Sequence, residues 1–152
     1  MLPRKIWIGA AVATVIGGTV FFLQLGEEGS PGSAESFDLA RGAQAYVEHC
    51  ASCHGADLKG EPNWRERKPN GRLPAPPHDA SGHTWHHPDA VLFKITKQGT
   101  AAIAPPGYES DMPGFADILS DAEIRDLLAY IHSRWPAEIR ARQAAISTAT
   151  DG

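Results

Sequence analysis

The sequence predicts an all-α protein in which three core helices surround a long irregular loop, preceded by an N-terminal transmembrane helix. Three observations predict this class: an uncharged run over residues 6–25, three later segments with apolar residues at helical spacing, and a proline-rich stretch over residues 55–87 without a sustained period. No segment alternates as a strand would, and no internal repeat is found. The length of 152 residues suits one domain with an appendage. The net charge of −4 argues against a nucleic-acid partner.

The uncharged run of 20 residues from Ile6 to Leu25 is long enough to cross a hydrocarbon core of about 30 Å as a helix. Two basic residues precede the run and two acidic residues follow it, which by the positive-inside rule leaves the N-terminus in the cytoplasm. We therefore expect residues 1–25 to anchor the protein in a lipid bilayer by a single pass, with everything after residue 26 exported.

A cleaved signal peptide is the alternative interpretation of this segment. Small residues at Gly32-Ser33-Ala34 suit a cleavage site, but the apolar core of such peptides is usually only about 7 to 15 residues long. Residues 26–35 are small and polar and contain a proline, so we expect a flexible linker there.

The three core helices are expected in residues 36–136, which we take as one domain. The first covers residues 36–50 and the second residues 88–98, where Gly99 is placed to end it. In the third, Ser120 and Glu123 form a capping box and Pro136 stops the helix. Residues 137–152 are expected to be a short helical or disordered tail. The apolar residues expected to face inward are Leu39, Ala43, Tyr46, Val47 and Cys50 in the first helix, Val91, Leu92 and Ile95 in the second, and Ile124, Leu127, Leu128, Ile131 and Trp135 in the third.

The 33 residues between Gly55 and His87 contain five prolines, and a connection of this length is unusual inside a compact domain. Three short helices offer little continuous apolar surface of their own. A large apolar cofactor enclosed by the loop is a physically sensible way to complete the core.

The segment Cys50-Ala51-Ser52-Cys53-His54 matches Cys-x-x-Cys-His, the attachment signature of c-type haem. Two thiols three positions apart can each reach one vinyl edge of the porphyrin, while His54 places its imidazole under the iron as the proximal ligand. A Cys-x-x-Cys redox pair is a weaker alternative because it does not require the histidine, and zinc is weaker still because a second cysteine pair is missing. We therefore expect one covalent haem c.

Residues 38–135 resemble the small single-haem class I cytochromes c, here in a membrane-anchored bacterial form. Besides the attachment motif, the resemblance depends on Met112-Pro113-Gly114-Phe115, on Ala75-Pro76-Pro77 and on Ala129-Tyr130-Ile131 in the last helix. It implies a fold of three core helices enclosing one haem. It also implies a close crossing of the first and last helices at Gly42, near Tyr130.

Met112 is expected to be the second axial ligand of the iron. Met1 and Met112 are the only methionines, so Met112 is the one thioether available to the exported haem, and its sequence context resembles the ligand loop of the family. A Met opposite a His raises the reduction potential and fills the last coordination site. The alternative is that Met112 only fills a gap in the core.

Two further residues are expected to contact the haem or its ligand. The resemblance implies that the carbonyl of Pro76 or Pro77 accepts a hydrogen bond from the imidazole of His54, and the choice between the two stays open. Trp85 is expected to pack on the haem edge and to donate its indole N–H to a propionate.

Four of the seven histidines, at positions 78, 83, 86 and 87, lie within ten residues of one another, which raises the possibility of a second metal site. No clean ligand spacing is present, and loop histidines commonly serve as caps or solvated surface. His49 and His132 are expected to be surface or capping residues. The basic stretch Arg65, Arg67, Lys68 and Arg72 suits either a docking lobe or a solvated loop.

These observations favour a single-electron carrier of a bacterial respiratory or periplasmic chain. Its iron would cycle between Fe(II) and Fe(III) with His54 and Met112 as axial ligands, exchanging electrons with donor and acceptor proteins and carrying out no bond chemistry of its own. The alternatives are a haem subunit of an oxidoreductase complex, a small haem peroxidase, and a metal-handling or sensor module that uses residues 78–87.

Overall fold

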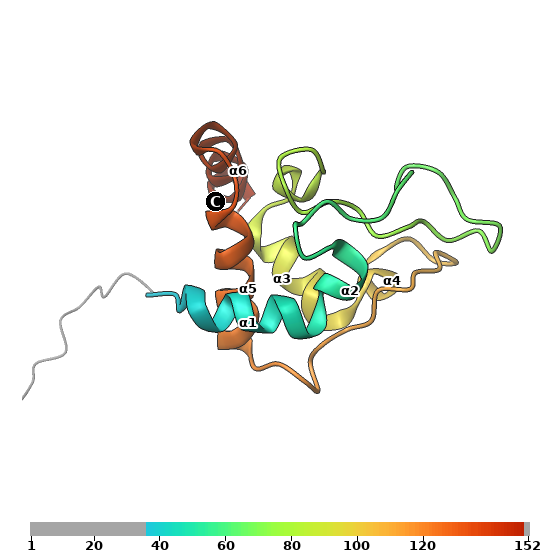
Figure 1. Ribbon diagram of the computed structural model, residues 1–152, viewed down its shortest axis with the longest axis horizontal. Coiled ribbons are helices and arrows are strands. Elements are labelled where there is room, and N and C mark those ends of the chain that lie inside the picture. The colour runs from blue at the N-terminus through green and yellow to red at the C-terminus, as the bar shows by residue number, and fades with distance from the viewer. Residues whose placement is uncertain (1–35, 151–152) are drawn as a thin grey trace, which may run out of the picture. The chain divides into compact units, whose positions relative to one another are not determined.

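The computed structural model describes residues 36–150, and within this range it contains helices and no strand (Figure 1). The predicted anchor (1–25) and linker (26–35) lie outside the described residues. Among residues 36–150, no helix is both long enough and apolar enough to span a membrane. The helices are α1 (Leu39–His49), α2 (Ala51–His54), α3 (Asp89–Gln98), α4 (Thr100–Ile103), α5 (Asp121–Ser133) and α6 (Ala137–Thr150), with a 3-10 turn η1 (Thr84–His86).

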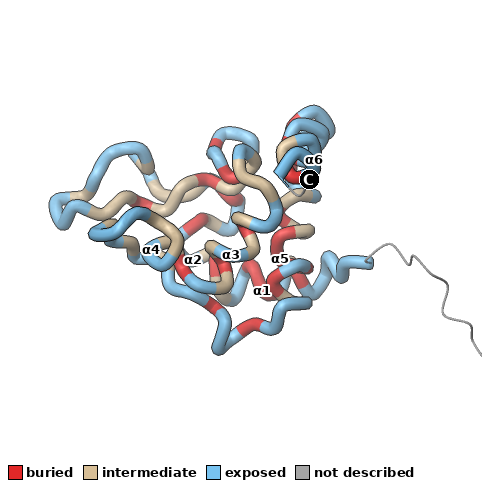
Figure 2. Tube along the Cα trace, turned by 180° about the vertical axis from the view of Figure 1, so that it is seen from behind, coloured by how far each residue is buried: buried red, intermediate tan, exposed pale blue. Residues whose placement is uncertain are grey.

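The core forms where α1 crosses α5, which Figure 2 shows as the main concentration of buried residues. A Cβ added to Gly42 would lie 2.5 Å from the carbonyl carbon of Asp126, so the two backbones touch at this point. One turn further along, the fully buried Tyr46 packs against Tyr130 with ring centroids 5.5 Å apart. The close crossing expected at Gly42 is present, although Asp126 lies nearer to Gly42 than Tyr130 does.

The buried face of α1 differs from the expected one. Leu39 and Val47 are 47% and 64% exposed, whereas Gly42, Ala45 and Tyr46 are buried. The expectation was wrong for Leu39 and Val47 because Gly42, which carries no apolar side chain, must face α5 and thereby sets the rotation of the helix.

The start of α1 is tied to α5 by the buried carboxylate of Asp126. Its Oδ1 accepts a hydrogen bond from the backbone N–H of Asp38 at 2.8 Å, and its Oδ2 pairs with the guanidinium of Arg41. Asp38 also caps α1 with its own side chain. The first and last core helices are thus joined by polar contacts as well as by packing.

The two other expected core helices are present. In α3, Leu92 is buried as expected and Thr96 is buried as well, while Val91 and Ile95 are half-buried. The capping box of Ser120 and Glu123 begins α5. The residues of the third helix that were expected inward are all buried, namely Ile124, Leu127, Leu128, Ile131 and, just after the helix, Trp135.

The segment expected to be a short helical or disordered tail contains α6, a helix of 14 residues. Its buried residues are Ile139, Gln143 and Ser147, one turn apart from each other. In both views α6 lies at the end of α5 opposite α1, beside the η1 turn. The tail is therefore an ordered helix that covers the end of the long loop.

Candidate haem site

The attachment segment lies where α1 passes into α2. Cys50 is the cap residue between the two helices and is buried, whereas Cys53 on α2 is exposed. Burial raises the pKa of the Cys50 thiol to about 11, so this thiol is protonated at neutral pH. A protonated thiol is a weak nucleophile, so Cys50 is not itself an activated thiol.

His54 ends α2 and is buried. Its Nδ1 lies 2.8 Å from the carbonyl oxygen of Pro76, so this carbonyl, and not that of Pro77, meets the imidazole. Since a carbonyl oxygen only accepts hydrogen bonds, Nδ1 carries the proton and Nε2 keeps its lone pair. Burial lowers the pKa of His54, which favours the neutral ring that a metal ion requires.

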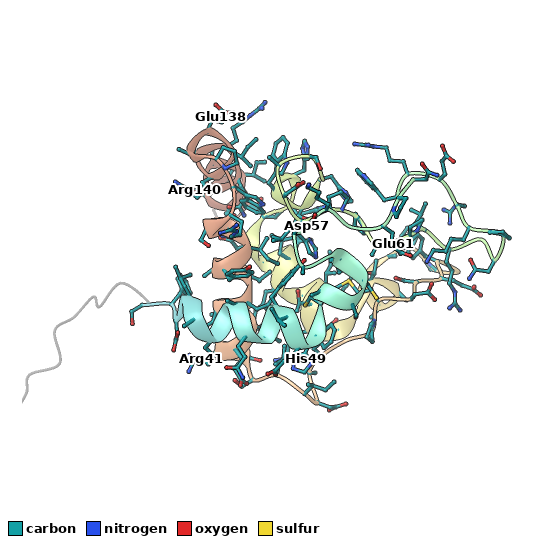
Figure 3. The ribbon with its side chains drawn as sticks, in the orientation of Figure 1. Arg41, His49, Asp57, Glu61, Glu138 and Arg140 are labelled. Atoms are coloured by element: carbon teal, nitrogen blue, oxygen red, sulfur yellow. The ribbon has the colours of Figure 1, made fainter. Side chains whose placement is uncertain are left out.

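Pro76 is held beside His54 by hydrogen bonds between two segments of the long loop. The backbone N–H of Glu61 donates to Ala75 at 2.9 Å, and the carboxylate of Glu61 accepts from the Ala75 N–H at 2.6 Å and from Lys68 at 3.2 Å. Glu61 lies on the loop beyond α2 (Figure 3). These contacts fix the position of Pro76, the residue after Ala75, whose carbonyl oxygen lies beside the imidazole of His54.

A second histidine, which the motif does not identify, packs against the first. The ring of His78 stacks on the ring of His54 with centroids 3.9 Å apart. His78 Nδ1 lies 2.8 Å from Oγ1 of Thr84, whose hydroxyl donates to the carbonyl of Pro77. Because the Thr84 proton is used there, His78 carries its proton on Nδ1, and burial holds its pKa well below the ordinary value. His78 is therefore a neutral ring that limits rotation of His54.

The loop containing Met112 is fastened on its C-terminal side to the end of α3. The backbone N–H groups of Phe115 and Ala116 donate to the carbonyls of Thr96 and Lys97, each at 3.1 Å. Met112 itself is half-buried and packs against the core. The hydroxyl of Thr100, on α4, donates to Sδ of Met112 at 3.3 Å.

On its N-terminal side the Met112 loop is joined to the long loop by ion pairs. The guanidinium of Arg72 pairs with Asp111, the residue before Met112, and lies 3.4 Å from the carboxylate of Glu109. In Figures 1 and 2 the two loops project to the same side of the molecule. Arg72 was expected only as part of the basic stretch, and Thr100 was not expected at all. No sequence pattern predicts their contacts with the Met112 loop, because these contacts exist only in the folded chain.

The remaining cations of the basic stretch also have partners. Arg65 lies over the ring of Trp64 at 3.9 Å, Arg67 donates to the carbonyl of Gly71 at 2.6 Å, and Lys68 pairs with Glu61. Two of the four cations, Lys68 and Arg72, are thus paired with carboxylates, whereas Arg65 and Arg67 contact uncharged groups of their own loop.

Trp85 on η1 supplies a polar atom that suits a haem substituent. The side chain is partly buried against the core, and its indole Nε1 is buried without a hydrogen-bond partner among the described residues. A buried N–H of this kind calls for an acceptor, and a haem propionate has the required chemistry. Together with a pair of free thiols on one helical turn and a neutral imidazole with a free Nε2, this donor makes the site fit a covalent haem.

The other histidines do not gather into a second metal site. The ring of His83 stacks on Trp64, that of His86 stacks on Trp85, and His78 is committed to His54. Within residues 36–150, no three His, Cys, Asp or Glu side chains are grouped so as to hold a metal ion.

The two helical histidines are more enclosed than expected for surface residues. His49 packs against Phe115. His132 stacks on Trp135, with its Nε2 3.4 Å from Asp89.

The comparisons with known proteins agree with this site. The family model described as cytochrome c matches residues 39–135. The chain is 26% identical over 103 residues to cytochrome c-555 of Prosthecochloris aestuarii, a match covering 64% of this chain and 88% of that protein.

Two cbb3-type cytochrome c oxidase subunits are also similar. Subunit CcoP of Rhodobacter capsulatus is 28% identical over 100 residues, and subunit FixP of Bradyrhizobium diazoefficiens is 27% identical over 101 residues. These matches cover 66% and 65% of this chain, but only 30% and 28% of the respective subunits. Since the family model accounts for well over half of the chain and its haem-attachment motif is intact, the protein belongs to the cytochrome c family and binds haem c covalently, for haem-based electron transfer.

Proposed function

We propose that this protein is a single-electron carrier whose haem iron is held between His54 and Met112. The haem supplies an iron that changes between Fe(II) and Fe(III). The protein holds the imidazole through Pro76 and His78 and keeps the thioether loop fastened on both sides. An iron with both axial positions filled has no site for a substrate, so the proposal is a carrier and not an enzyme.

The observation that carries the proposal is the fixed, neutral imidazole of His54 together with the anchored thioether of Met112. His54 is buried at the end of α2, and Met112, in the loop between α4 and α5, packs against the hydrophobic core. Met112 is the only methionine in the described residues.

The test is the variant Met112→Ala in the haem-loaded protein. We expect the wild type to contain a six-coordinate, low-spin haem, and we expect the variant to lose the absorption band of the Met–iron bond. The reduction potential should fall by on the order of 0.1 V, within the roughly 0.8 V that axial ligands cover. Ile118→Ala is the matched control, because Ile118 belongs to the same loop and is 59% exposed.

An unchanged spectrum in Met112→Ala would show that another group ligates the iron, and His83 and His86 would then be replaced in turn. A wild-type haem that is five-coordinate and binds small ligands rapidly would instead support the peroxidase alternative. These outcomes separate the carrier from an enzyme by spectroscopy alone.

We further propose that residues 1–25 hold the carrier at a bacterial inner membrane, with the haem domain in the periplasm. The support is the charge-free length of residues 6–25 and the charge difference between its ends. Tethering raises the effective concentration of the carrier near redox partners in the membrane. Fractionation of cells that express the full chain, with protease added to intact spheroplasts, tests this proposal. A haem domain found only in the cytoplasm would contradict it.

The similarity to the two oxidase subunits favours a second candidate, a haem subunit of an oxidoreductase complex. This candidate uses the same haem site and differs from the first in its partners. Purification of the full chain from native membranes under mild conditions distinguishes the two: stoichiometric copurification with other subunits indicates the complex, and isolation alone indicates the separate carrier.

A further inference from the structure

The sulfur of Met112 receives a hydrogen bond from Thr100. The Oγ1–Sδ distance is 3.3 Å, and both side chains are partly buried. The other described threonine hydroxyls that donate hydrogen bonds do so to backbone carbonyls, as Thr96 does to Leu92 at 2.9 Å. Thr100 therefore differs from these threonines in its acceptor, which is a side-chain sulfur atom and not a backbone carbonyl.

The close approach is built into the backbone at Gly99. This residue ends α3 with a φ of +84°, and a Cβ added to it would lie 2.8 Å from the backbone nitrogen of Gly114. The chain reversal at Gly99 brings Thr100, the first residue of α4, against the Met112 loop. Because only glycine combines this φ with so close an approach, the position of the hydroxyl is determined by the fold.

We propose that Thr100 is a positioning residue that tunes the reduction potential of the haem through the sulfur of Met112. This inference rests on the proposed ligation by Met112. A thioether sulfur has two lone pairs, so it can donate one to iron and accept a hydrogen bond with the other. The hydroxyl proton draws electron density from the sulfur and weakens its donation to the iron.

Weaker electron donation from the sulfur destabilises Fe(III) more than Fe(II), because the ferric ion carries one more positive charge. Reduction adds one electron to the iron and transfers no atom, so the hydrogen bond changes only the relative stability of the two oxidation states. With Thr100 present, the ferrous state is favoured and the potential is higher.

The experiment compares Thr100→Val with Thr100→Ser in the haem-loaded full chain. Valine keeps the shape and removes the donor, so we expect the equilibrium constant for reduction to fall about threefold, given the modest strength of single hydrogen bonds. For a one-electron couple this is a potential about 30 mV lower, since tenfold corresponds to about 59 mV. Serine keeps the hydroxyl and should restore the wild-type potential. The energy of the Met–iron absorption band should shift in the valine variant and return in the serine variant.

Thr148→Val is the matched control, because the hydroxyl of Thr148 on α6 bonds to the backbone carbonyl of Ala144 and takes no part in the haem site. Its potential should stay at the wild-type value. An unchanged potential in Thr100→Val, or an equal shift in the Thr148 control, would overturn the role of Thr100. A wild-type protein without the Met–iron band would instead contradict the ligation by Met112, so the two proposals fail by different observations.

Discussion

At the scale of single residues, the position of α1 on α5 depends on the absence of a side chain at Gly42. The helix backbones meet there, and the carboxylate of Asp126 reaches back to Asp38 and Arg41 beside the crossing. Tyr46, one turn later, donates its hydroxyl to the carbonyl of Gly55 at 2.9 Å. A displacement of α1 would therefore also move Gly55, the residue that follows His54.

Gly42→Ala tests this dependence. In a solvent-exposed helix the change would stabilise by about 0.5 to 1 kcal/mol, because alanine has the higher helix propensity. Here the added Cβ meets the carbonyl group of Asp126, so we expect a destabilisation of about 1 to 3 kcal/mol, as for overpacked cores. The change in the free energy of unfolding is measured by denaturant unfolding of the haem-loaded protein, followed by circular dichroism. Ala40→Gly, at an exposed position of α1, is the control that measures the difference in helix propensity between alanine and glycine without a change in packing. A stabilised Gly42→Ala protein would show that the helices do not touch there.

The residues of the haem site differ in how well the sequence predicts them. The difference depends on how far apart in the chain the interacting residues lie. Cys50, Cys53 and His54 form a contiguous motif, so spacing alone predicts their chemistry. The choice of Pro76 over Pro77 depends on a hydrogen bond across 22 residues, and no local pattern distinguishes two adjacent prolines. The contact of Thr100 with Met112 is likewise visible only after folding.

At the scale of elements, α5 and α6 show what hydrophobic periodicity can and cannot predict. The apolar residues of α5 repeat at helical spacing behind a capping box, so its existence and buried face follow from the sequence. The buried face of α6 includes the polar side chains of Gln143 and Ser147, so an apolar pattern cannot reveal its packing. The four-residue helix α4 is too short to leave any periodic signal.

Gln143 is expected to hold α6 in place. It is 3% exposed, and its Nε2 lies within hydrogen-bonding distance of the Asp89 carboxylate, the Ser147 hydroxyl and the carbonyl of His87. Gln143→Ala leaves these acceptors without the donor, so we expect a loss of about 1 to 3 kcal/mol in unfolding free energy. Amide exchange should be faster in α6 and η1, while the Met–iron band stays unchanged.

The matched control is Gln44→Ala, which removes an exposed glutamine that bonds only to Glu48 in the same helix. Its stability should change by less than about 0.5 kcal/mol. Equal effects of the two substitutions would mean that α6 contributes no packing of its own to the fold.

At the scale of the whole molecule, the haem site draws on almost every part of the domain. In the proposed site, His54 comes from α2 and Cys50 from the junction of α1 and α2. Pro76 and Trp85 come from the long loop, and Met112 comes from the loop before α5. The two loops meet through Arg72, and the described part of the long loop contains no regular structure besides η1. Loops of this length cannot bury much apolar surface by themselves.

The fold is therefore expected to depend on the covalent haem, which removal of both attachment thiols tests. In Cys50→Ser/Cys53→Ser the porphyrin is no longer bonded to the chain, and the loops lose the apolar body against which they pack. We expect a colourless protein with most of its helical circular dichroism lost and no cooperative unfolding transition, because the conformational entropy of the long loop is no longer offset. Ser52→Ala, which changes the exposed residue between the cysteines, should keep both the haem and the transition. A colourless double variant that still unfolds cooperatively would show that α1, α3 and α5 form a stable core without the cofactor.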